Sequence, residues 1–124
     1  MNKNTKLTLA ELLKRKEQML ESKKTKKTID LYVKSIDATI TIKEPDGALC
    51  RDANDMDAGV GDKYLCYECI TEPNLKSKEV QDAFGCTEPM DVVDIIFEPG
   101  EIPQIAIECM KLAGYMGGVE QVKN

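Results

Sequence analysis

Five cysteines are the side chains of this chain best suited to chemistry, and two of them, Cys66 and Cys69, have the CxxC spacing. A CxxC pair holds zinc when four ligands are complete, and it exchanges electrons when it begins a helix after a strand. The chain has no histidine, and its other cysteines stand singly as Cys50, Cys86 and Cys109. The pattern therefore favours Cys66, Cys69 and Cys109 as thiols buried on apolar helix faces. The alternative hypothesis is that the protein is a small intracellular regulatory or zinc-binding module that uses Cys66 and Cys69.

The absence of histidine also excludes the catalytic sites that depend on imidazole, including Ser-His-Asp triads, Cys-His dyads and zinc proteases. The acidic stretch at residues 52–57 lacks the glycine and the final glutamate of a calcium-binding loop. The Gly59-Val60-Gly61 stretch before Lys63 lacks the spacer of a phosphate-binding loop and is expected to be a turn. We therefore predict a protein that is not an enzyme and has no cofactor and no metal site.

Charge is distributed unevenly along the 124 residues. Of the 17 basic and 22 acidic residues, nine and three fall within residues 1–27, a balance of +6, which leaves eight and 19 for the rest, a balance of −11. The Lys-rich run at residues 23–27 has no aromatic residue for stacking and no arginine for reading bases, so no nucleic-acid partner is expected. Apolar runs are too short for a membrane span, and no signal-peptide core is present, which indicates an intracellular protein without a membrane partner.

The strongest local pattern lies near the N-terminus. Thr8 followed by Glu11 is a helix-capping pair. Four leucines then recur at helical spacing: Leu9, Leu12, Leu13 and Leu20. The pattern predicts one amphipathic helix over residues 9–22, followed by a Lys-rich linker. The leucine stripe either folds back on the rest of the chain or binds a partner, and the sequence leaves both open.

Apolar and polar residues then alternate over residues 28–33 and 38–42, which predicts two strands joined by a short link at residues 34–37. From Pro45 onward the chain is predicted to form about five short helices separated by breakers. We expect them over residues 46–56, 62–70, 77–84, 87–97 and 101–113, with Ser77 and Thr87 as caps and Gly85 and Gly114 as stops. The side chains expected to be buried on these helices include Leu65, Ile70, Val92, Val93, Ile95, Ile96, Phe97, Ile102, Ile105, Ala106 and Leu112.

These elements predict an α+β fold that is mostly α, with an N-terminal helix, one β-hairpin and a bundle of about five short helices. We expect three segments. Residues 1–27 form the amphipathic helix and the Lys-rich linker, residues 28–116 form a compact domain, and residues 117–124 form a flexible tail.

Three pieces of sequence resemble one known family. They are Glu-Pro-Asn-Leu-Lys at residues 72–76, Phe-Glu-Pro-Gly-Glu-Ile at residues 97–102 and Leu-Ala-Gly-Tyr at residues 112–115. Together with the order of the N-terminal helix and the hairpin, they resemble the XkdN-like tail assembly chaperones of contractile-tailed bacteriophages and phage-derived bacteriocins. The resemblance covers most of the chain.

The resemblance implies a non-catalytic protein of the bacterial host cytoplasm that is absent from the mature particle. Such chaperones bind the tape-measure protein, keep it soluble and help recruit tail-tube subunits during tail assembly. Many are extended by a ribosomal frameshift, so this chain is expected to be the short form, with residues 117–124 as its free end. We predict that the partner is bound through Leu9, Leu12, Leu13 and Leu20, and self-association is left open.

Overall fold

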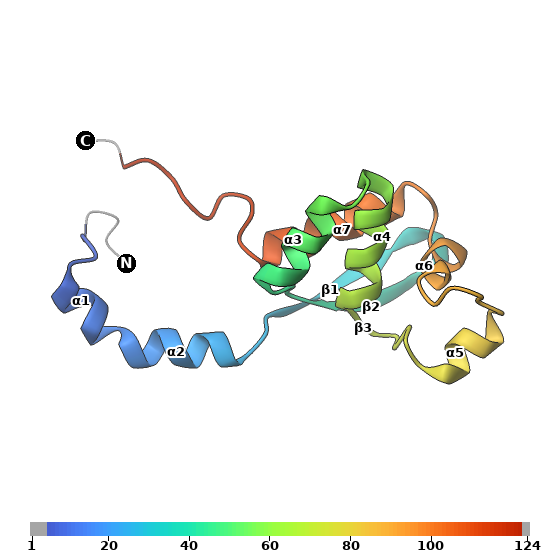
Figure 1. Cartoon of the computed structure of the whole chain (residues 1–124), viewed down its shortest axis with the longest axis horizontal. Helices are drawn as coiled ribbons and strands as arrows, with labels where there is room; N and C mark the ends of the chain where they lie inside the picture. Colours follow the sequence, from blue (N-terminus) through green and yellow to red (C-terminus); the bar gives the residue numbers. More distant parts are fainter. Residues whose placement is uncertain (1–4, 123–124) are drawn as a thin grey trace.

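The computed structural model describes residues 5–122 and combines helices with one small antiparallel sheet (Figure 1). Within these residues the chain forms, in order, α1 (Leu9–Lys14), α2 (Lys16–Lys24), β1 (Thr28–Val33), β2 (Ala38–Lys43), α3 (Gly47–Asp55), α4 (Ala58–Cys69), β3 (Ile70–Glu72), α5 (Lys78–Ala83), α6 (Asp91–Ile96) and α7 (Glu101–Leu112). The predicted class, α+β and mostly α, is confirmed.

The predicted hairpin is present, and its register determines which residues face the core. β1 and β2 are antiparallel, with Ile29 opposite Ile42 and Val33 opposite Ala38. A single 3-10 turn, η1 (Lys34–Ile36), joins them, and Asp37 closes the turn in the left-handed conformation that Asp tolerates, with φ 45°. β3 pairs with the other edge of β2, so the strand order is β1-β2-β3. The sequence pattern does not predict β3, because the apolar run of the preceding helix continues through Ile70.

The hydrophobic core lies between the sheet and the layer of helices around α4, which packs against α3, α6 and α7 (Figure 1). The core is made of aliphatic side chains and thiols with a single phenylalanine, as a chain poor in aromatic residues requires. The side chains that are at most 5% exposed include Val33, Ile40, Ile42, Leu65, Cys66, Cys69, Ile70, Leu75, Val92, Val93, Phe97, Ile105, Ala106 and Cys109. The predicted burial of Cys66, Cys69 and Cys109 is confirmed.

α4 begins four residues before the predicted start at Asp62, so the turn expected at Gly59-Val60-Gly61 is wrong. Gly61 lies inside this helix, buried where α4 crosses α3. A Cβ atom at this position would lie 2.3 Å from the carbonyl oxygen of Ala53. The glycine therefore permits a close approach of two helices and is not a turn residue.

The region around α5 and α6 confirms two predicted signals and corrects two others. Ser77 caps α5 by accepting a hydrogen bond from the backbone N–H of Val80 at 3.2 Å, and Gly85 ends it with φ 63°. Thr87 does not cap the next helix, which begins only at Asp91. Ile95 was expected to be buried but is 50% exposed, because this one-and-a-half-turn helix turns Val92 and Val93 to the core.

The turn that replaces the predicted first turn of α6 is held by the side chain of Gln81. Its Nε2 donates to the carbonyl of Leu75 at 2.8 Å and to the carbonyl of Pro89 at 3.0 Å. α6 is in turn fixed to α4, because the Lys63 ammonium lies 2.8 Å from Asp91 and 2.6 Å from Asp94. These hydrogen bonds raise the pKa of Lys63.

The N-terminal segment forms two helices, and the prediction of one helix over residues 9–22 is wrong in this respect. The break falls at Arg15, with φ −93° and ψ 0°, whose N–H is shared between the carbonyls of Glu11 and Leu12. α2 then extends to Lys24, so two residues of the expected linker are helical. Lysine is a good helix former, and the Lys24 ammonium lies 3.6 Å from Glu21.

Candidate partner-binding surface

The four leucines predicted to bind a partner lie on α1 and α2 and are exposed. The exposed fraction is 72% for Leu9, 41% for Leu12, 62% for Leu13 and 57% for Leu20. None of the residues of α1 or α2 is buried. A concentration of exposed leucine on one short segment is typical of a surface that binds another polypeptide.

We call residues 5–27 the N-terminal arm, since α1 and α2 stand apart from the compact part of the molecule (Figure 1). The arm is ordered by local bonds. The Thr8 hydroxyl accepts from the N–H of Glu11 at 3.2 Å, which confirms the predicted cap. The Arg15 guanidinium donates to the carboxylate of Glu11, also at 3.2 Å, across the bend between the two helices.

The bend divides the predicted stripe into two parts. Leu9, Leu12 and Leu13 are three and four residues apart on α1, so they share one side of that helix. Leu20 belongs to α2, where Met19 beside it is 38% exposed. The structure brings the first three leucines together and places the fourth on a separate helix.

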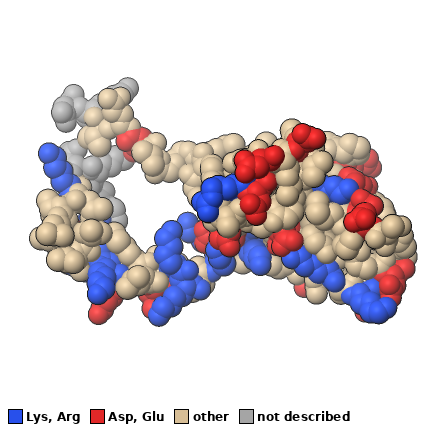
Figure 2. All heavy atoms as spheres, in the orientation of Figure 1, with Lys and Arg blue, Asp and Glu red and all other residues tan. Residues whose placement is uncertain are grey.

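Basic side chains accompany these leucines. Figure 2 shows lysine and arginine along the arm, while most of the acidic side chains visible in this view belong to the compact part. Among the described residues, the excess of basic residues in the arm and of acidic residues in the rest of the chain is therefore also a separation in space. In the part of the chain that the structure describes, no helix combines the length and the hydropathy needed to cross a membrane.

The C-terminal segment adds exposed apolar side chains, and Figure 1 shows it extending to the same side of the molecule as the arm. Tyr115, Met116, Val119 and Val122 are each at least 50% exposed. A hollow of about 360 Å³ lies where the arm meets the compact part, lined in part by Lys23, Lys26 and Tyr115. The four exposed apolar residues of the C-terminal segment follow the last helix and show no apolar period, so the sequence pattern does not identify them as a binding surface.

A second apolar feature, also missed from the sequence, is a groove of about 520 Å³ between the α3–α4 pair and the end of α7. Three methionines line it: Met56, Met110 and Met116. Methionine adapts its shape to varied partners, so such a groove suits apolar side chains without selecting one shape. The sequence signal is weak, because the lining comes from residues more than fifty positions apart.

In the described residues no group of three or more His, Cys, Asp or Glu side chains is placed to hold a metal ion. The Cys66 thiol contacts the carbonyl of Ile102 at 3.4 Å, and burial raises its pKa to about 12. The Cys109 thiol is hydrogen-bonded to Cys69 and buried, and both effects raise its pKa. The same hydrogen bond with Cys109 lowers the pKa of Cys69. Buried thiols that stay protonated are poor nucleophiles, so Cys66 and Cys109 act as small core residues.

Comparison with known protein families gives a match. The family model of the phage XkdN-like tail assembly chaperone proteins matches residues 2–124, nearly the whole chain. No curated protein matches the chain, and no solved structure does.

Proposed function

The chain belongs to the XkdN-like phage tail assembly chaperone family, and from this premise we propose that it binds the tape-measure protein and helps recruit tail-tube subunits. In this proposal the chaperone works without catalysis in the cytoplasm of the bacterial host, keeps the tape-measure protein soluble and is absent from the mature particle. The proposal includes tails of the contractile kind, in phages or phage-derived bacteriocins.

The observation that supports this proposal is the exposed leucine surface of the N-terminal arm. A tape-measure protein is a long, extended helical chain with much apolar surface, which aggregates unless that surface is covered. Burying a leucine that is now more than half exposed contributes about 1 kcal/mol or more, and 1.4 kcal/mol is about tenfold in affinity. Leu9, Leu13 and Leu20, with Leu12 at 41% exposed, therefore contribute to the binding of an amphipathic helix.

We further propose a division of labour along the chain. Residues 1–27 form the binding arm, residues 28–116 form the domain that carries it, and residues 117–124 form a tail. The basic character of the arm and the acidic character of the domain support this division, because the domain keeps a bound apolar chain in solution through its net negative charge.

The test is co-expression with the tape-measure protein encoded by the same phage. The chaperone is expected to raise the soluble yield of the tape-measure protein severalfold, and the double variant Leu12→Asp/Leu13→Asp is expected to lose this effect. The matched control is Gln18→Asp/Ser22→Asp, which adds the same charge to polar positions of the arm. A leucine variant that keeps full activity, or a control that loses it equally, would contradict the proposal.

The same variants show whether the leucines belong to the arm alone. Because no residue of α1 or α2 is buried, Leu12→Asp/Leu13→Asp should leave the free energy of unfolding, measured by thermal melts, within about 1 kcal/mol of the wild-type value. General unfolding of this variant would mean that the leucines are part of the core.

A further inference from the structure

The N-terminal arm is joined to the domain by a short hinge. α2 ends at Lys24, and Lys27 is fixed to the sheet, because the N–H of Glu44 donates to its carbonyl at 2.8 Å and its own N–H donates to the Glu44 carboxylate at 3.1 Å. Between these two fixed points lie Thr25 and Lys26. In Figure 1 the hinge holds the arm in an open position, away from the helices of the domain. A change in the backbone dihedral angles of these two residues moves the whole arm.

The groove of about 520 Å³ between the α3–α4 pair and α7, which we call the methionine groove, adjoins the base of the arm. Tyr115 lines both this groove and the hollow where the arm meets the domain. α3 passes along both, since Cys50 lines the hollow, whereas Ala53 and Met56, farther along the chain, line the groove. The groove therefore leads away from the hinge, toward the start of α4 at Ala58.

One side of α2 already faces the domain at its hinge end. Lys23 lines the hollow beside Tyr115. Lys16 precedes Lys23 by seven residues, which is two turns, and Leu20 lies between them, so the three side chains share one side of α2. Met19, beside Leu20, borders the same side. If the arm turned at the hinge, this side would lie on the methionine groove, with Leu20 in the middle and Lys16 at the far end.

The far end of the methionine groove carries the charge that complements Lys16. Asp62 contributes a carboxylate to the lining, and Asp55 and Asp57 flank Met56. Within residues 5–122, which the structure describes, none of these three carboxylates forms an ion pair, and neither does Lys16. An apolar helix side with a lysine at its far end therefore matches an apolar groove with carboxylates at its far end.

The length of α2 also fits. From Lys24 back to Lys16 the helix extends about 12 Å at 1.5 Å per residue. Along the domain, α3 advances about 9 Å from Cys50, at the hollow, to Met56, at the acidic end of the groove. The lysine side chain reaches several ångströms beyond its backbone, so Lys16 and Asp62 come within range of each other.

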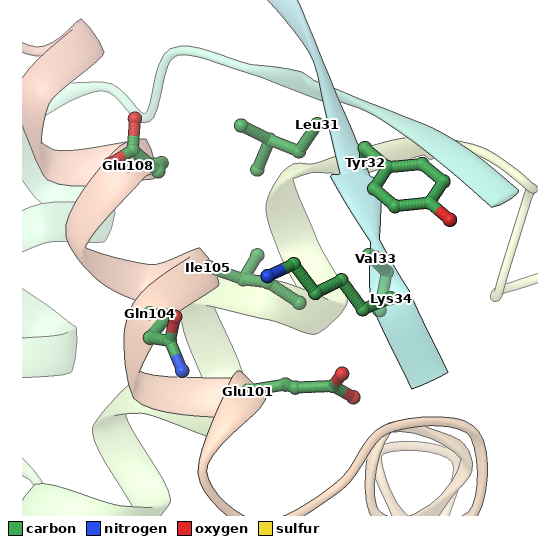
Figure 3. A pocket seen from close by; sticks show the side chains of 8 residues that line it. All are labelled: Leu31, Tyr32, Val33, Lys34, Glu101, Gln104, Ile105 and Glu108. Carbon is green, nitrogen blue, oxygen red and sulfur yellow. The ribbon is translucent and has the colours of Figure 1, made fainter. Parts of the chain in front are cut away.

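A groove of about 430 Å³ between β1 and α7 lacks this complementarity (Figure 3). Its carboxylates already have partners within the chain. The Glu101 carboxylate accepts from the Ser35 hydroxyl at 2.8 Å and from the Glu98 N–H at 2.9 Å. The Glu108 carboxylate lies 3.2 Å from the Lys111 ammonium. A basic helix is therefore attracted to the methionine groove in preference to this one.

We propose that the methionine groove is the docking site of α2 of the same chain. In the free protein the arm turns at the hinge, Leu20 enters the groove, and the Lys16 ammonium pairs with the Asp62 carboxylate. A short tether gives an effective concentration on the order of millimolar, so this α2 occupies the groove before the α2 of a second copy does in dilute solution. The leucines of α1 lie beyond Lys16 and stay available to a partner, whereas a partner that also takes Leu20 displaces α2 from the groove.

The first measurement is the nuclear Overhauser effect between methyl groups in the full chain, with leucine and methionine methyls labelled. Cross-peaks from Leu20 to Met110 and Met116 are expected, and their relative intensity should not change over a tenfold range of protein concentration. A mixture of one sample labelled on leucine and another labelled on methionine should give none. Absence of the cross-peaks in the fully labelled chain, or their presence in the mixture, would overturn the proposal, and the second result would assign the groove to another copy.

The second measurement is a charge reversal read out by the same cross-peaks. Lys16→Glu and Asp62→Lys should each lower their intensity at least threefold, and the double variant should recover most of the loss. Lys24→Glu is the matched control, because it makes the same change of charge on a different side of α2, and it should keep the cross-peaks. Full intensity in Lys16→Glu, or an equal loss in Lys24→Glu, would contradict docking through the Lys16 side.

Folding of these variants is checked by circular dichroism. Since no residue of α2 is buried, Lys16→Glu leaves the domain folded, and the comparison with Lys24→Glu holds whatever the stability of Asp62→Lys. Lack of recovery in a folded double variant would refute the pairing of Lys16 with Asp62.

The docking is measured on the free chaperone, and the proposed function is measured by co-expression, so the two can fail separately. Cross-peaks without a rise in the soluble yield of the tape-measure protein support the docking and contradict the proposed function. A rise in yield without the cross-peaks supports the proposed function and contradicts the docking.

Discussion

At the scale of single residues, two glycines in the first turn of α4 have opposite roles. Gly61 lies against the backbone of Ala53, where any side chain would collide with a carbonyl oxygen. Gly59, two positions earlier in the same helix, has open space around it. Substituting each glycine by alanine therefore separates the effect of close helix packing from the effect of backbone freedom.

We predict that Gly61→Ala lowers the free energy of unfolding by about 1–3 kcal/mol, because α3 and α4 must move apart to admit a methyl group. Gly59→Ala, the matched control, should raise stability by about 0.4–1 kcal/mol, because alanine restricts the unfolded chain. Urea unfolding of the two variants measures both effects. Equal destabilisation would mean that the helix interior, and not the contact with Ala53, determines the cost.

What the sequence reveals at this scale depends on the range of the interaction. The caps at Thr8 and Ser77 could be predicted because a cap involves residues only three positions apart. The role of Gly61 could not be predicted, since it depends on a backbone atom of another helix. The four leucines were identified by spacing, but spacing did not reveal the bend at Arg15 that divides them.

At the scale of elements, α7 shows how a helix is held by one face. Ile105 is 4% exposed and packs in the core, whereas Ile107, two residues later, is 43% exposed. The two isoleucines are chemically identical, so their substitution measures the contribution of position alone.

Ile105→Asp is predicted to unfold the domain or to cost about 3–5 kcal/mol, because it leaves a buried charge without a partner. The control Ile107→Asp should cost less than about 1 kcal/mol, since its side chain reaches water. Thermal melts of both variants provide the comparison. Comparable melting temperatures for the two would contradict the assignment of the core face.

The hairpin and five later helices could be predicted because their apolar periods are local. β3 could not, because three residues hold no recognisable period and this strand forms only by pairing with β2. The start of α6 was misplaced for a related reason. Thr87 and Pro89 have the right types for a helix start, but the Gln81 side chain fixes the carbonyl of Pro89 in a turn.

At the scale of the whole molecule, the chain separates an exposed apolar and basic arm from an acidic domain that buries its own core. This arrangement supports the proposal that the arm binds the partner, since such binding involves few residues and leaves the domain intact. The match to the tail assembly chaperone family extends over nearly all of the chain. The resemblance of the sequence to the family indicated a tail assembly chaperone, whereas the separation of the arm from the domain became evident only in the structure.

Hydrogen exchange of the chaperone with and without the tape-measure protein, followed by mass spectrometry, tests the central claim most directly. We predict that the peptides covering α1 and α2 become strongly protected in the complex, while the core of the domain changes little. Unchanged exchange in residues 9–24 of a chaperone that nevertheless binds the tape-measure protein would contradict the claim that the arm is the binding surface.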